Sequence, residues 1–100
     1  MEESTALLIG RRVLASQERY RKYVEEHTKE WQDTGTKLRN ARDSLNVSRS
    51  QMRTLIKISE ATIARLERGL PIKARKIVEA AYGNALHLTQ LQRQQALTAI

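Results

Sequence analysis

The stretch from Ser48 to Gly69 reads SRSQMRTLIKISEATIARLERG and contains the start and stop signals of two short helices. Ser48 and Gln51 have the spacing of a capping box, in which each side chain covers a free backbone N–H at a helix start. Ser59 offers a second N-cap, and Gly69 ends the second helix. Two amphipathic helices of about two turns each, joined by a short turn, form a helix-turn-helix unit.

Apolar residues recur at helical spacing in both segments and predict which helix faces are buried. Met52, Leu55 and Ile56 form one stripe on the first helix. Ile63 and Leu66 form the apolar face of the second helix. The sequence therefore predicts that these side chains contribute to the core.

This stretch and its flanks resemble the Xre-type (Cro and phage repressor) family of helix-turn-helix proteins. The positions that match the family's spacing are Leu38-Arg39, Arg42, Ser48, Met52, Ile58-Ser59, Ile63 and Leu66-Glu67-Arg68-Gly69. The resemblance implies an all-α fold, with a five-helix phage-repressor-like domain over residues 34–100 and a long N-terminal helix over residues 1–33 before it. It also implies an inward salt bridge between Arg42 and Glu67, which would tie the first domain helix to the recognition helix.

Two residues depart from the family pattern. Arg53 stands where the family nearly always has Ala between the two helices, so its aliphatic stem must bend outward. Lys57 stands at the turn position where the family favours Gly, and a positive φ at a non-Gly residue costs on the order of 1 kcal/mol. We therefore expect the two helices of the motif to cross at a wider angle than is usual in the family, with the fold retained.

The composition indicates one small helical domain. The chain has 100 residues, four Gly, one Pro and no Phe, which suits a single modest core built from helices. Cysteine is absent, so disulfides and thiolate metal sites are excluded, and a cytoplasmic location is expected. The longest apolar run, Ala6 to Ile9, is too short to cross a membrane, so no membrane partner is expected.

The positive charge is concentrated in the helix-turn-helix part of the chain. The net charge is +7, and residues 1–33 carry six Lys or Arg against seven acidic residues, whereas residues 34–100 carry twelve against four. A basic excess on a helix-turn-helix fold is the electrostatic footprint of a nucleic-acid-binding protein. The alternative interpretation is an ordinary solvated cationic surface.

An apolar stripe along the N-terminal helix predicts a dimer interface. Val13, Tyr20, Val24 and Trp31 recur near every 3.5 residues, and large aromatic side chains often anchor interfaces. This helix is longer than the small domain can cover, so a coiled-coil-like homodimer is expected. The alternative is that the helix folds back on its own domain.

Helix breaks are expected at two further places. Asp33 or Thr34 can cap a helix over Lys37 to Leu45, with Gly35 loosening the boundary at residues 32–36. After Pro71 a helix is expected to run to Gly83, where Asn84 caps a last one. The apolar residues expected to be buried in these last two helices are Ala74, Ile77, Val78, Ala81, Leu88 and Leu91.

The resemblance also implies which residues bind DNA. In the family geometry the second helix of the motif enters the major groove, and the positions that would face bases are Glu60, Ala61 and Arg65. A guanidinium fork suits guanine, a methyl group suits thymine, and a carboxylate suits the cytosine amino group. Glu60 has a second interpretation, as a solvent-facing residue favoured by the helix dipole. The expected phosphate contacts are Arg49, Ser59, Thr62, Arg68, Lys73, Arg75 and Lys76, and Arg49 could instead support the recognition helix.

The sequence lacks the residue constellations of an enzyme. It contains no nucleophile and base at a recognisable spacing, no paired carboxylates and no glycine-rich phosphate loop, so a non-enzyme without metal or cofactor is expected. The leading hypothesis is a transcription regulator, a repressor from a phage or mobile element, that binds a two-fold operator in double-stranded DNA as a dimer. The alternative is a helix-turn-helix interaction module that acts as an antirepressor or modulator of a protein partner.

Overall fold

The computed structural model describes residues 5–98, so the outermost ends of the two predicted segments, residues 1–4 and 99–100, lie outside it. The described chain is all-α, as predicted. Its helices are α1 (Thr5–Ser44), α2 (Arg49–Ile56), α3 (Glu60–Glu67) and α4 (Arg75–Thr98). The predicted number of helices is wrong, because the expected breaks at residues 32–36 and at Gly83 are absent.

α1 is one continuous helix of 40 residues that belongs to both predicted segments. Gly35 lies inside it, where a Cβ atom would stand 2.5 Å from the carbonyl oxygen of Leu66 and 2.6 Å from that of Glu67. This glycine therefore lets α1 approach the end of α3 closely and does not loosen a boundary. Packing against the domain offsets the roughly 1 kcal/mol that a glycine costs in a helix interior.

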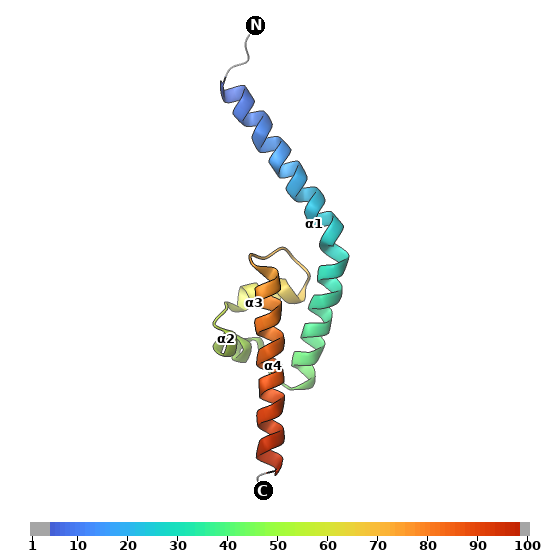
Figure 1. The fold of residues 1–100 in the computed structure, drawn as a ribbon, viewed down its shortest axis with the longest axis vertical. Coiled ribbons are helices and arrows are strands. Elements are labelled where there is room, and N and C mark those ends of the chain that lie inside the picture. The colour runs from blue at the N-terminus through green and yellow to red at the C-terminus, as the bar shows by residue number, and fades with distance from the viewer. Residues whose placement is uncertain (1–4, 99–100) are drawn as a thin grey trace.

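α4 begins later than expected and then runs through the predicted break at Gly83. It starts at Arg75, after Ala74 takes a left-handed φ of 51°, and one glycine inside a 24-residue helix costs only about 1 kcal/mol. The prediction that Leu88 and Leu91 are buried is wrong, because both are exposed on the last turns. Figure 1 shows α4 beside the second half of α1 and running on past its end.

The predicted helix caps between residues 48 and 69 are confirmed. The Ser48 hydroxyl accepts from the Gln51 amide at 3.1 Å, and the Gln51 side chain accepts from the Ser48 amide at 2.8 Å. Lys57 ends α2 with a φ of 60°, as expected for its position. Ser59 caps α3, and Gly69 follows it with a φ of 75°. These local interactions fix where α2 and α3 begin and end.

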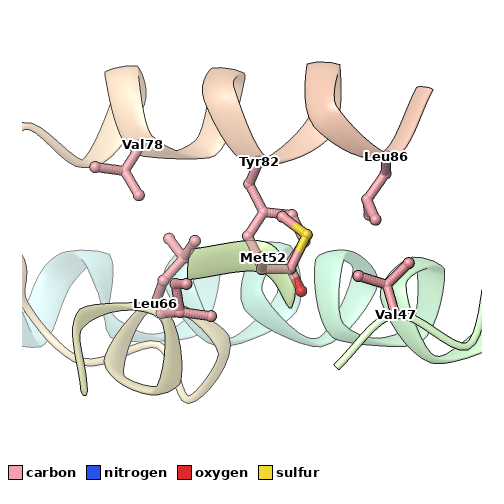
Figure 2. Close-up of a cluster of buried hydrophobic side chains, with 7 residues drawn as sticks. Val47, Met52, Leu66, Val78, Tyr82 and Leu86 are labelled. Carbon is pink, nitrogen blue, oxygen red and sulfur yellow. The ribbon is translucent and has the colours of Figure 1, made fainter. Parts of the chain in front are cut away.

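The core lies where α2, α3 and α4 meet the end of α1. Figure 2 shows side chains of α4 on one side and, facing them, side chains of α2, of α3 and of the segment before α2. The buried apolar residues that form this cluster are Val47, Met52, Ile63, Leu66, Val78, Tyr82 and Leu86. Leu55 and Ile77 were predicted to be buried and are exposed, because Met52 and Val78 occupy the inner faces of their helices.

The molecule is elongated because half of α1 leaves the domain. Its principal extents are 83 × 24 × 16 Å. Figure 1 shows the first half of α1 leaning away from the other helices, so that its first turns lie farthest from them. Every described side chain from residue 8 to residue 23 is exposed.

Candidate nucleic-acid interface

A buried charged network fixes the orientation of α3. The Arg42 guanidinium donates to both Glu67 carboxylate oxygens, at 2.8 and 3.0 Å, which confirms the expected ion pair. Tyr82 Oη donates to Glu67 at 2.7 Å, and Arg49 Nε donates to it at 3.0 Å. The Glu67 side chain is only 1% exposed. The four contacts therefore tie α3 to α1, α2 and α4 at one carboxylate.

The network shifts the pKa of each of its buried members. Burial by itself would raise the pKa of Glu67, but the hydrogen bonds from Arg42, Tyr82 and Arg49 hold that pKa below its ordinary value of 4.5. The hydrogen bond to Glu67 raises the pKa of Arg42. Burial, with the adjacent Glu67 carboxylate, raises the pKa of Tyr82. Glu67 is therefore ionised and Tyr82 protonated at neutral pH.

The shift on Glu67 predicts how stability depends on pH. Because its folded pKa lies below its unfolded pKa, the stability from the ionised carboxylate is present above about pH 4.5 and is lost as the pH falls through the folded value. We expect the difference in unfolding free energy between the wild type and Glu67→Gln to be large at neutral pH and to shrink in acid. Urea unfolding at several pH values measures this difference. A difference independent of pH would contradict the assignment.

Arg75 was predicted to contact phosphate, and the structure places it in the scaffold instead. Its side chain is 7% exposed, and Nη2 donates to the carbonyls of Trp31 at 3.0 Å and Leu66 at 3.2 Å. Nη1 donates to Leu70 at 3.0 Å and Nε to Glu79 at 2.8 Å. The cation thus satisfies carbonyls at the C-terminal end of α3, where the helix dipole favours positive charge.

The exposed face of α3 contains the residues predicted to read bases. Glu60 and Ala61 lie exposed at its N-terminal end, and Arg65 lies exposed one turn after Ala61. Arg68, the C-cap residue, extends this face. The opposite face, which carries Ile63 and Leu66, is fully buried. α3 therefore presents one solvent-facing edge with a carboxylate near its start and two guanidinium groups near its end.

The Arg65 guanidinium is held beside the helix in this structure. Nε and Nη2 donate to the Pro71 carbonyl at 3.3 and 2.9 Å. The side chain therefore contacts the segment between α3 and α4. To form a bidentate contact with guanine, it must exchange the Pro71 carbonyl for the base edge.

The remaining residues predicted to contact phosphate differ in their exposure and in the contacts that they already make within the protein. The Ser59 hydroxyl accepts from the Thr62 amide at 3.2 Å and donates to its hydroxyl at 2.9 Å. Arg49 supports Glu67, which was the second of its two expected roles, and its side chain stays 41% exposed. Lys73 is exposed. Lys76 is 81% exposed, but its amine lies 3.6 Å from a Glu30 carboxylate.

The predicted dimerisation residues differ in how far their own domain covers them. Val13 and Tyr20 are exposed, and Val24 is half-buried. Trp31 is buried against its own domain, with the Arg75 guanidinium 5.2 Å from its ring centre. Trp31 is therefore not available as an interface anchor, because α1 docks on its own domain at this position.

Two contributions of single residues were missed in the sequence. Tyr82 is fully buried and forms hydrogen bonds with Glu67 and Arg42. Its position four residues after Val78 was a usable signal that it shares the buried face of α4. Arg75 gave a weaker signal: Glu79 stands four residues after it, but its carbonyl acceptors, Trp31, Leu66 and Leu70, lie outside its own helix.

Among residues 5–98, no helix is long and apolar enough to cross a membrane, and no group of three or more His, Cys, Asp or Glu side chains could hold a metal ion. Comparisons with protein-family models, curated proteins and solved structures found no match.

Proposed function

We propose that this protein is a cytoplasmic, dimeric transcription regulator of the Xre type, which represses genes of a phage or mobile element by binding a two-fold operator. The observation that carries the proposal is the exposed edge of α3, held by the buried Arg42–Glu67–Tyr82 network beside α2. A rigidly held helix with a solvent-facing edge suits insertion into a major groove. The basic excess of residues 34–100 suits the phosphate backbone.

In this proposal the start of α3 points into the groove. Ala61 and Glu60 meet base edges near the N-terminal end, and Arg65 leaves the Pro71 carbonyl to bind a guanine. Ser59 and Thr62 lie at the phosphate backbone on one side. Arg68 and Lys73 neutralise phosphates on the other, and Arg75 acts only by holding the end of α3 in place.

Two alanine substitutions separate base recognition from phosphate binding. We expect Arg65→Ala to weaken binding to a selected site by about 1–3 kcal/mol and to leave binding to random duplex nearly unchanged. We expect Lys73→Ala to weaken binding to both DNAs and to lower the slope of log K against log salt by about one unit. Gel shifts at two salt concentrations, with a site selected from a random duplex library, measure both effects.

Lys22→Ala is the matched control, because Lys22 is an exposed cation on the part of α1 that leaves the domain. It should bind both DNAs like the wild type. The melting temperature of Arg65→Ala should also be recorded, since the lost contact to Pro71 could loosen the segment after α3. Equal losses on selected and random DNA would remove Arg65 from base recognition.

The second candidate function is an interaction module that modulates a protein partner. It is favoured by the exposed apolar side chains of α1 and by the engagement of Arg65 with Pro71. Absence of DNA binding at low salt, with the chain folded, would favour this function over the first.

A further inference from the structure

The first half of α1 presents an apolar face that its own domain does not cover. Ile9, Val13 and Tyr20 are between 49% and 59% exposed, and they lie on one side of the helix with Tyr23. A helix without tertiary contacts is only marginally stable in water, so this face needs a covering surface. In heptad terms Val13 and Tyr20 occupy a positions, and Ser16 and Tyr23 occupy d positions.

The face continues into a groove where α1 meets the start of α4. The groove has a volume of about 490 Å³, and its walls include Tyr20, Tyr23, His27 and Ile77. The Tyr23 and His27 rings lie at a tilt of 38° with their centres 4.2 Å apart, and Ile77 is 73% exposed. The apolar face of α1 therefore leads directly into an open groove of the same molecule, whose lining combines apolar and aromatic side chains with Glu30, Arg75 and Lys76.

We propose that a second copy of the chain covers this face in the antiparallel direction, with the start of its α1 lying in the groove. Val13 then lies opposite Tyr23 of the second copy, and Ser16 lies opposite Tyr20. In this register Ile9 of each copy comes beside His27 of the other, at the groove. The two-fold relation makes both grooves equivalent, so the contact closes as a dimer. This inference rests on the proposed function, because it specifies how the dimer forms.

Charge complementarity selects this direction. Arg12 and Glu26 occupy g positions beside the apolar face, and neither forms an ion pair within residues 5–98. In the antiparallel register Arg12 of each copy faces Glu26 of the other, which creates two equivalent ion pairs. In a parallel pair the same side chains would face Gln17 and Trp31, which carry no charge. The register also brings Arg19 of one copy near Arg19 of the other. Two favourable ion pairs therefore accompany one contact between like charges.

The arrangement separates the two DNA-binding domains. Gly35, where α1 contacts α3, lies about 17 residues from the midpoint of the antiparallel overlap, which corresponds to about 26 Å of helix. The two domains would therefore stand about 50 Å apart along the pair. This separation exceeds one turn of DNA, so half-sites more than one turn apart are expected.

A charge exchange in the full-length chain tests the direction. We expect Arg12→Glu and Glu26→Arg each to raise the dimer dissociation constant about tenfold at low salt, because each change turns both ion pairs into pairs of like charges. The double variant restores both ion pairs and should dimerise within about threefold of the wild type. Arg19→Gln should tighten the dimer. Sedimentation equilibrium over a range of protein concentrations measures all four.

Lys22→Glu is the matched control, because it makes the same change of charge on the opposite side of α1 and should leave dimerisation unchanged. If the double variant dimerised no more tightly than the single variants, the inference would be overturned. The proposed function would still stand in that case, provided that the wild type is a dimer. A wild type that stays monomeric at all concentrations would overturn both the inference and the proposed dimer. Restored dimerisation in a chain that binds no DNA would support the inference and contradict the DNA-binding function.

Cysteine pairing gives a second, independent test, because the natural chain contains no Cys. A mixture of Val13→Cys and Tyr23→Cys chains should form a disulfide-linked dimer on mild oxidation, since the two positions face each other. Neither chain should crosslink with itself, because like positions lie about 15 Å apart along the antiparallel pair. Rapid self-crosslinking of Val13→Cys would indicate a parallel pair and contradict the proposal.

Discussion

Glu67→Gln is expected to lower the free energy of unfolding by about 3–5 kcal/mol, because it removes one charge from a buried ion pair and leaves the Arg42 guanidinium with only the 55% exposed Asp43 carboxylate as its counter-ion. For a chain of this size the melting temperature should fall by more than about 10 °C. The amide keeps the shape of the carboxylate, so the loss reports the charge rather than a cavity. Thermal unfolding followed by circular dichroism measures the shift.

Two further variants test whether the loss comes from the buried pair. Glu18→Gln removes an acid whose ion pair with Arg21 is 71% exposed at both side chains, so its effect should stay below about 0.5 kcal/mol. Arg42→Met should cost much less in the Glu67→Gln background than in the wild type, because the two side chains act as one unit. A wild-type melting temperature for Glu67→Gln would show that the network contributes little to stability.

Gly35→Ala is expected to cost about 3 kcal/mol, although alanine is the better helix former. The new methyl group would stand 2.5 Å from the Leu66 carbonyl oxygen and 2.9 Å from the Glu67 carbonyl carbon. Both atoms belong to the backbone, so α1 and α3 must move apart, and overpacking of this kind typically costs about 1–3 kcal/mol or more. Chemical denaturation at neutral pH measures the loss.

Gly10→Ala and Gly83→Ala are matched controls for this prediction. Both glycines lie inside helices, and an added Cβ meets nothing within 4 Å at either one. Each substitution should stabilise the protein by about 0.5–1 kcal/mol, the usual gain at an unobstructed helical site. If Gly35→Ala stabilised the protein by the same amount, the close approach of α1 and α3 would be incorrect.

The ends of α2 and α3 could be predicted because their signals act within a few residues. Ser48 and Gln51 exchange hydrogen bonds across one turn, and Ser59 caps the turn that follows it. Lys57 took the left-handed conformation, which was expected from the resemblance because the family favours Gly at this turn position. The Arg42–Glu67 pair was also predicted, but from a resemblance in pattern and not from the separate residues.

The candidate interface was predictable only in part, because the hydrogen-bond acceptors that a long side chain can reach depend on how the helices pack. Arg65 and Arg75 both appear in the sequence as cations within or shortly after the segment of α3. One is exposed and turned to a neighbouring carbonyl, and the other is buried among carbonyls of α1 and α3. Spacing along the chain does not distinguish them, because the acceptors of Arg75 include Trp31, 44 residues away.

The sequence by itself determined the all-α class, the caps of α2 and α3 and the apolar faces of Met52, Ile63 and Leu66, because these depend on interactions within a turn or two of helix. Only the tertiary structure decided that Gly35 continues a helix, that Trp31 docks on its own domain and that Arg75 is buried. A glycine or an amphipathic arginine permits several local outcomes of similar free energy. Contacts with distant backbone carbonyls select among them, and those contacts exist only once the helices have packed.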